Sequence, residues 1–212
     1  MSVFLDLLSL YEGEGITVQT SLNPGHFPGF TFQDIPFTYM YQDGELLAKG
    51  GGIAFAEIAF LELLFGCFRP KQIFIVGNAF GWSTLVLAML NPGARVVAID
   101  FCPTQVEEEG LAFTNRMGQR LGIDVRARKG KSPEDVADIV EAEMGAPVDC
   151  SLIDGWHTKE AQRADFEAVK SVASTDCVYL FHDVINLLLA DGFAAIARDN
   201  PQLISSLLFR TT

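Results

Sequence analysis

Short apolar runs alternate with amphipathic stretches along most of the chain. Five runs are apolar on both faces, as expected of buried parallel strands, and span residues 73–76, 96–99, 125–127, 150–153 and 178–181. Helical periodicity occupies residues 54–65, 83–90, 104–121, 133–144, 159–172 and 191–199. The alternation predicts an α/β fold with a mostly parallel sheet and helices on both faces.

The two ends of the chain are less regular. The first part is rich in proline and aromatic residues, so we interpret residues 1–50 as an irregular cap or oligomerisation segment with room for one helix. Residues 51–212 then form the main domain, with a last strand expected at residues 203–209. A domain of this size can bury roughly 70% of the surface that its unfolded chain exposes.

Charge and composition limit the partners of the protein. Fifteen basic and 27 acidic residues give a net charge of −12, which would repel a nucleic-acid backbone. Hydrophobic residues make up 49% of the chain, including 17 Phe, so we expect a second copy to cover part of the surface. The composition therefore predicts a homo-oligomer, such as a homodimer, that does not bind nucleic acid.

The sequence contains neither a secretion signal nor a membrane span by our interpretation. No basic leader precedes the first apolar residues, and Glu57 and Glu62 interrupt the most hydrophobic stretch, residues 53–68. The four cysteines are far apart and form no Cys-x-x-Cys pair. We therefore expect a protein of the reducing cytoplasm with no membrane partner.

Polar residues follow four of the five predicted strands. Residues 77–81 (GNAFG) follow the first strand, Asp100 ends the second, residues 154–157 (DGWH) follow the fourth, and His182 and Asp183 follow the fifth. Ligands of an open parallel sheet bind beyond the carboxyl ends of its strands. We expect these four segments to meet in one functional site.

The first two segments have the chemistry of a nucleoside site. Gly77 and Gly81 permit a tight turn into the helix that begins near Ser83, whose free N–H groups favour an anionic group. The carboxylate of Asp100 can accept hydrogen bonds from both hydroxyls of a ribose. Together they predict a nucleoside-containing ligand.

The same segments resemble the class I S-adenosylmethionine-dependent methyltransferases, which have a Rossmann-like, doubly wound fold. Within these, the sequence is most similar to the bacterial small-molecule O-methyltransferases related to catechol O-methyltransferase. The likeness spans roughly residues 50–200. Four motifs carry it, at residues 73–84 (IFIVGNAFGWST), 97–100 (VAID), 152–157 (LIDGWH) and 180–184 (LFHDV).

The resemblance implies S-adenosyl-L-methionine as cofactor and a small molecule as substrate. It implies that the glycine loop holds the methionine part, Asp100 the ribose, and Phe101, Ser132 and Trp156 the adenine. The implied cofactor contacts are Gly77, Asn78, Ala79, Gly81, Ser83, Asp100, Phe101, Ser132, Asp154 and Trp156.

Three features depart from the family pattern. Ile75 stands where the family usually has an acidic residue, and Lys159 stands where a Tyr is common. The family sheet closes with an antiparallel hairpin, whereas this chain stops after the first strand of it. The last strand is then missing, or an N-terminal segment replaces it.

Two mechanisms fit the residues that follow the fourth and fifth strands. His157 and His182 are candidate bases, because an imidazole titrates near neutral pH. Asp154 is the third candidate catalytic residue. By resemblance to the catechol enzymes, Asp154, His182 and Asp183 would match the ligands of a divalent cation such as Mg²⁺, and His157 a lysine base. Histidine–aspartate hydrogen bonds without a metal suit the same residues equally well.

Two other functions share part of this pattern. A nicotinamide-dependent oxidoreductase would use the same glycine turn and Asp100, but the third glycine of Gly-x-Gly-x-x-Gly and a Tyr-x-x-x-Lys pair are absent. A catalytically silent cofactor-binding subunit would account for Ile75 and the short C-terminal part. A methyltransferase is the interpretation that uses all four motifs.

Overall fold

The computed structural model describes residues 2–20, 37–47, 52–185 and 188–203. The N-terminal elements are α1 (Val3–Gly13), β1 (Thr17–Gln19), β2 (Tyr39–Gln42) and β3 (Glu45–Leu46). They are followed by α2 (Phe55–Cys67), β4 (Gln72–Val76), α3 (Trp82–Leu90), β5 (Arg95–Asp100), α4 (Gln105–Leu121), β6 (Val125–Lys129), α5 (Val136–Glu143), β7 (Val148–Ile153), α6 (Lys159–Ser171), β8 (Ala173–Phe181) and α7 (Ala190–Asp199).

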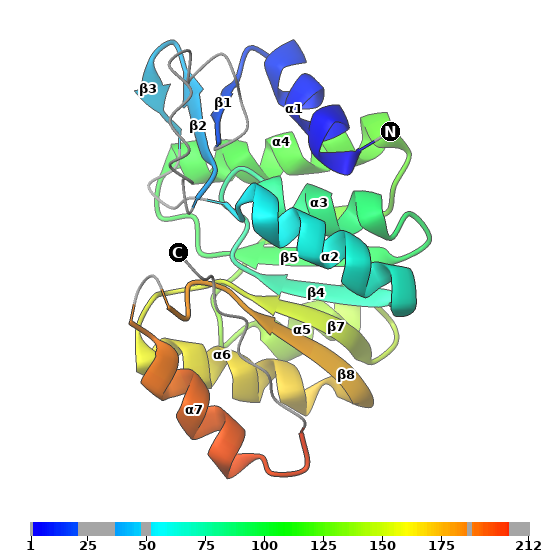
Figure 1. Cartoon of the computed structure of the whole chain (residues 1–212), viewed down its shortest axis with the longest axis vertical. Helices are drawn as coiled ribbons and strands as arrows, with labels where there is room; N and C mark the ends of the chain where they lie inside the picture. Colours follow the sequence, from blue (N-terminus) through cyan, green and yellow to red (C-terminus); the bar gives the residue numbers. More distant parts are fainter. Residues whose placement is uncertain (1, 21–36, 48–51, 186–187, 204–212) are drawn as a thin grey trace.

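The main sheet has five parallel strands in the order β6-β5-β4-β7-β8 (Figure 1). The chain therefore runs outward from β4 through β5 to β6 and then returns to the other side of β4. All five predicted strands and the predicted Rossmann-like α/β fold are confirmed. The predicted strand at residues 203–209 lies almost entirely outside the described residues, with only Leu203 inside them.

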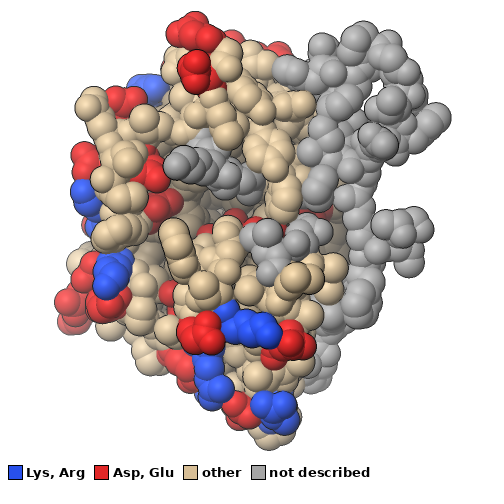
Figure 2. Space-filling view, turned by 90° about the vertical axis from the view of Figure 1, so that its left-hand side faces the viewer, with Lys and Arg blue, Asp and Glu red and all other residues tan. Residues whose placement is uncertain are grey.

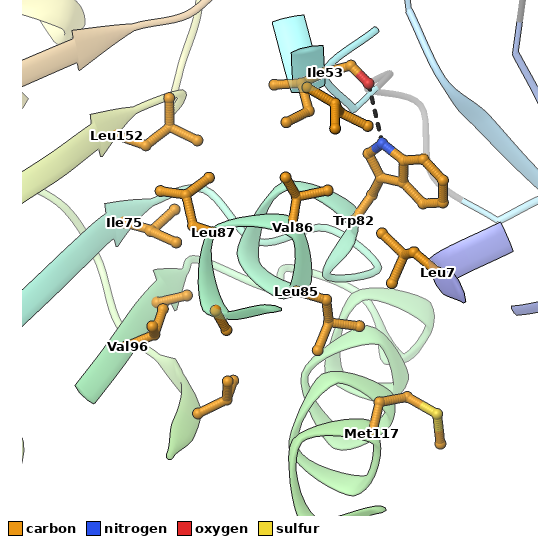
Figure 3. Packing of buried hydrophobic residues seen from close by; sticks show 14 of the residues in the cluster. Leu7, Ile53, Ile75, Trp82, Leu85, Val86, Leu87, Val96, Met117 and Leu152 are labelled. Atoms are coloured by element: carbon orange, nitrogen blue, oxygen red, sulfur yellow. Dashed lines mark hydrogen bonds between the residues drawn. The ribbon is translucent and has the colours of Figure 1, made fainter. Parts of the chain in front are cut away.

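Helices cover both faces of the sheet because successive strand residues point to opposite sides. Ile73 and Ile75 of β4 belong to a core shared with α1, α2, α3 and α4, whereas Phe74 and Val76 pack with α5 and α6. Figure 3 shows the first of these cores, in which residues of α3 lie among side chains of the strands and of α1. Both faces of β4 are buried, as its apolar sequence predicts.

Helix ends mostly agree with the local sequence signals. Thr104 precedes α4 and donates its hydroxyl to Glu107, whose Oε2 accepts the Thr104 N–H at 2.8 Å, while Gly122 ends the helix in the left-handed conformation. The predicted helix at residues 133–144 begins later, at Val136. Within the described residues, none of the helices has the length and hydrophobicity needed to cross a membrane.

The N-terminal residues are more regular than expected. We predicted an irregular segment with room for one helix, but α1 is followed by a three-stranded antiparallel sheet, β1-β2-β3. Phe4, Leu7 and Tyr11 lie on one face of α1, at helical spacing, and all three are buried against the core beside α3. The N-terminal elements therefore share the core that also contains Trp82.

Candidate functional site

The loops that follow β4, β5 and β7 meet at the carboxyl edge of the sheet. Figure 2 views the molecule from the side of this edge and shows a hollow at its centre with Asp and Glu atoms on the floor. The cavity has a volume of about 150 Å³. Its lining residues are Met40, Gly52, Gly77, Asn78, Ala79, Trp82, Ser83, Asp100, Asp154, Gly155 and His157.

The glycine loop after β4 requires its first glycine. Gly77 has a φ of +96°, and a Cβ added there would lie 2.1 Å from the carbonyl oxygen of Asp154. The turn brings the loop directly against Asp154, the residue that follows β7. Gly81 is also left-handed and begins α3 as its N-cap, so that the loop leads into a helix N-terminus.

The side chain of Asn78 points into the protein and holds the loop. Its Nδ2 donates to the Ala79 carbonyl at 2.9 Å and to Thr114 Oγ1 at 3.1 Å, and its Oδ1 accepts from Thr84 Oγ1 at 3.0 Å. Asn78, which we predicted to contact the cofactor, therefore lines the cavity with its side chain engaged in the loop itself.

Asp100, the last residue of β5, links this strand to the glycine loop. One carboxylate oxygen, Oδ2, accepts the N–H groups of Asn78 at 2.9 Å and Ala79 at 2.7 Å. The other oxygen has a long contact of 3.4 Å with the Cys102 N–H, which leaves it able to accept from a ligand hydroxyl. Burial, followed by the charge of Asp100, raises the pKa of the Cys102 thiol to about 12, so this thiol is protonated and inert at neutral pH.

Four ionisable residues form a cluster after β7 and β8, which we call the ionic rim: Asp154, His157, His182 and Asp183. His182 Nδ1 lies 3.1 Å from Asp154 Oδ1 and 3.2 Å from Asp183 Oδ2. His157 Nε2 lies 3.0 Å from Asp183 Oδ2 and 3.6 Å from Asp154 Oδ1. Each carboxylate therefore lies between two imidazoles.

The charges of the ionic rim reinforce one another. The side chain of His182 is 2% exposed; burial alone would lower its pKa, but the charge of Asp154 and its carboxylate hydrogen bonds raise it well above the ordinary value. Hydrogen bonds to Asp154 and Asp183, opposed by burial, raise the pKa of His157 to about 9. Burial would raise the pKa of Asp183, but its bonds to the two histidines lower it to about 2. Without a bound cation, these contacts favour the protonated form of both imidazoles.

Glu57 of α2 extends the rim and was not predicted. Its Oε2 lies 3.3 Å from His182 Nε2 and also accepts the Ala54 N–H at 2.7 Å at the start of α2. The sequence carries a signal for the second contact, since an acidic residue in the first turn often caps a helix. No local pattern indicates the contact with His182.

Three residues predicted to surround the adenine do not line the cavity. Phe101 and Trp156 are 58% and 79% exposed. Ser132 donates its hydroxyl to Asp165 Oδ1 at 2.5 Å, and burial raises the pKa of that Asp165 carboxyl. Trp156 is an exposed residue and not part of the core.

The ionic rim also has the composition of a cation site. Asp154, His182 and Asp183 each offer one ligand atom, and these atoms lie within 4.8 Å of one another. Two carboxylates and an imidazole are ligands that divalent cations use in proteins. The buried Oδ1 of Asp183 has no hydrogen-bond partner in the structure, so a further acceptor is free next to the cluster. The residues therefore fit a cation, and they also form complete histidine–aspartate pairs without one.

Comparisons with known proteins agree with the fold and motifs. A family described as a methyltransferase domain matches residues 75–184, which is more than half of the chain. The match begins in β4 and ends just after β8. It contains three of the four motif segments in full, and the first from residue 75 onward. No curated protein matches the sequence.

Three solved structures illustrate the similarity. The O-methyltransferase from Bacillus cereus in complex with SAH is 22% identical, covers 71% of each chain and has a TM-score of 0.55. A putative caffeoyl-CoA O-methyltransferase from Staphylococcus aureus is 13% identical, covers 95% of this chain and 79% of its own, and has a TM-score of 0.53. The cofactor-bound Rv0187 from MTB is 26% identical, covers 71% of this chain and 68% of its own, and has a TM-score of 0.52.

The fold and the loops at the carboxyl edge define a class I S-adenosylmethionine-dependent methyltransferase. The chain belongs to the methyltransferase domain family whose pattern matches residues 75–184.

Proposed function

We propose that the protein transfers a methyl group from S-adenosylmethionine to a hydroxyl of a small molecule. The observation that carries the proposal is that Asp154 and His157 line the same cavity as the glycine loop and Asp100. A donor held by the loop and Asp100 would then present its methyl group to an acceptor at the ionic rim. Two structural neighbours are described as O-methyltransferases, which supports oxygen as the accepting atom.

Alignment and proton removal are the two tasks left to the protein, because a sulfonium donor already carries a good leaving group. The acceptor oxygen attacks the methyl carbon, the carbon–sulfur bond breaks, and S-adenosylhomocysteine remains. We assign the acceptor proton to His157, because its side chain is 37% exposed and lines the cavity, whereas the side chain of His182 is 2% exposed and does not line it.

The carboxylates of the rim stabilise His157 after it takes up the proton. Asp183 Oδ2 lies 3.0 Å from His157 Nε2. A carboxylate in this position orients the imidazole and stabilises its positive charge. In the unliganded rim the same contacts keep a proton on His157, so this proton must leave to solvent when the acceptor enters. His182 is a positioning residue in this mechanism, because it holds Asp154 and Asp183 together.

Asp154, His182 and Asp183 would hold a divalent cation such as Mg²⁺. A cation bound there supplies a lower pKa and a fixed orientation for the acceptor hydroxyl. The test compares turnover in chelator and after addition of magnesium, with Asp183→Ala as the control that should respond to neither. Full wild-type activity in chelator would restrict the proposal to the metal-free histidine–aspartate rim.

Ligand binding tests the proposed cofactor directly. A ligand that binds only the folded state raises the melting temperature by mass action, so S-adenosylhomocysteine should raise it and NAD should not. A shift with NAD alone would contradict the assignment. Cofactor binding without turnover on a broad panel of acceptors would instead identify a silent cofactor-binding subunit.

The predicted homo-oligomer and cytoplasmic location remain part of the proposal. The described surface carries large apolar side chains such as Leu63, which is 75% exposed on α2. Light scattering on the purified full chain, over a range of concentrations, measures the number of copies. A mass of one chain at every concentration would contradict the prediction.

A further inference from the structure

The N-terminal helix α1 reaches the glycine loop through one buried hydrogen bond. The hydroxyl of Tyr11 donates to the carbonyl oxygen of Phe80 at 2.6 Å, and Tyr11 is 0% exposed. Phe80 is the fourth residue of the loop at residues 77–81. Tyr11 lies outside the segment that matches the methyltransferase family, which begins at residue 75.

The surroundings of Tyr11 make this bond hard to replace. Its ring contacts Trp82, with 5.4 Å between ring centroids, and Phe113, at 4.9 Å. Burial in this aromatic environment raises the pKa of the hydroxyl well above its ordinary value, so it remains a donor. Without the hydroxyl, the Phe80 carbonyl would lose this partner in a place where water has little access.

Tyr11 completes a set of contacts that fix the loop from several sides. Asp100 holds the N–H groups of Asn78 and Ala79, and the Asn78 side chain joins the loop to Thr114. These contacts act on the second and third residues of the loop. Tyr11 acts on the fourth, from the N-terminal helix α1.

The same helix supports a wall of the cavity. Trp82 lines the cavity and packs against both Tyr11 and Phe4, the latter with 6.3 Å between ring centroids. Trp82 Nε1 donates to the Ile53 carbonyl at 3.0 Å, which fixes the indole in place (Figure 3). Tyr11 therefore touches the loop and the adjoining wall together.

We infer that Tyr11 is a positioning residue for cofactor binding, which sets the shape of the glycine loop before the cofactor arrives. This inference rests on the proposed placement of the cofactor at that loop. A loop held in its binding conformation loses less freedom when the ligand binds, and so binds it more tightly. The helix α1 is then part of the cofactor site although none of its residues lines the cavity.

The test measures affinity for S-adenosylhomocysteine by calorimetry, separately from the melting temperature of the unliganded full chain. Tyr11→Phe keeps the ring and removes only the hydroxyl. Its dissociation constant should rise roughly five- to fifteenfold, the effect expected of one buried hydrogen bond. Tyr179→Phe is the matched control, because Tyr179 is a half-buried tyrosine of β8 whose hydroxyl contacts Cys177 and not the loop. Its affinity should equal that of the wild type.

The outcomes separate the inference from the proposed function. If the wild type does not bind S-adenosylhomocysteine, the proposed cofactor site is wrong and the role of Tyr11 is wrong with it. If wild type and Tyr11→Phe bind equally well, only the role of Tyr11 is overturned, even if the variant melts at a lower temperature.

Hydrogen exchange on the wild type gives a second test that needs no variant. If Tyr11 fixes the loop, the amides of residues 77–81 should exchange through the same opening that exposes α1. Loop amides that exchange freely while α1 stays protected would overturn the inference. This measurement decides the question even if Tyr11→Phe fails to fold.

Discussion

The carboxyl edge of the sheet has two halves, the glycine loop with Asp100 and the ionic rim, and different kinds of interaction hold them. Around the glycine loop and Asp100, the contacts involve the backbone: the N–H groups of Asn78 and Ala79 donate to Asp100, and the side chain of Asn78 holds the loop. At the ionic rim, the contacts are between charged side chains, and each carboxylate lies between two imidazoles. The first half depends on the shape of the chain, and the second depends on charge.

The two halves therefore tolerate different substitutions. A backbone site is sensitive to any added atom that changes the path of the chain, because the N–H groups move with it. An ionic site keeps its backbone when a side chain is removed, but the partners left behind lose their compensating charge. Substitutions at the two halves should therefore fail in different ways.

The largest effect is expected for Gly77→Ala. A methyl group there would meet the Asp154 carbonyl, and a φ of +96° is strained for alanine. We expect loss of measurable S-adenosylhomocysteine binding and a loss of stability of about 3 kcal/mol or more, from strain and overpacking together. Calorimetry and thermal melting measure both. Gly93→Ala is the control, since a Cβ there would meet nothing within 4 Å, and it should bind like the wild type.

The next effect is the loss of His157, which tests the charged half. His157→Ala should lower turnover roughly a hundredfold, the usual contribution of a general base, and leave S-adenosylhomocysteine affinity nearly unchanged. Steady-state rates with any accepted substrate, measured beside calorimetry, separate chemistry from binding. Wild-type turnover in both His157→Ala and His182→Ala would mean that the rim is only a strand ending.

Asp100→Ala should have a smaller effect on cofactor binding than Gly77→Ala. The variant loses a carboxylate that accepts from the loop and from the expected ribose, which should weaken S-adenosylhomocysteine binding by about 1–3 kcal/mol. Asp100→Asn keeps the shape and removes the charge, so it should lie between the wild type and alanine. An unchanged dissociation constant in both variants would remove Asp100 from the cofactor site.

The smallest effect is expected for Trp156→Ala. The resemblance places Trp156 beside the adenine, but its side chain is 79% exposed and does not line the cavity. We expect a loss of affinity of about two- to threefold, the low end of what an aromatic contact contributes. A loss of tenfold or more would show that Trp156 closes over the bound cofactor.

The sequence predicted the sheet and the four segments at its edge because both leave local signals. Apolar runs such as residues 73–76 and 150–153 identify buried strands without knowledge of their partners. In a parallel sheet the residues after such strands must share one edge, so Asp100 and Asp154 could be expected near the glycine loop. The N-terminal sheet was missed because its strands are very short.

Side-chain partners in the site could not be predicted, because they depend on packing between distant segments. Nothing near Glu57 in the sequence indicates His182, and nothing near Tyr11 indicates Phe80. The inward turn of Asn78 depends on Thr114, which α4 brings to the loop. These contacts exist only after the helices have packed on the sheet.

The position of β4 in the middle of the sheet affects how the protein can be made. Ile73 of β4 pairs with Val96 of β5 and with Cys150 of β7. During synthesis, β5 follows β4 closely in the chain. The Asp154 carbonyl, against which the glycine loop packs, is made only after β7. A growing chain therefore contains both β4 and β5 well before the proposed cofactor site can be complete.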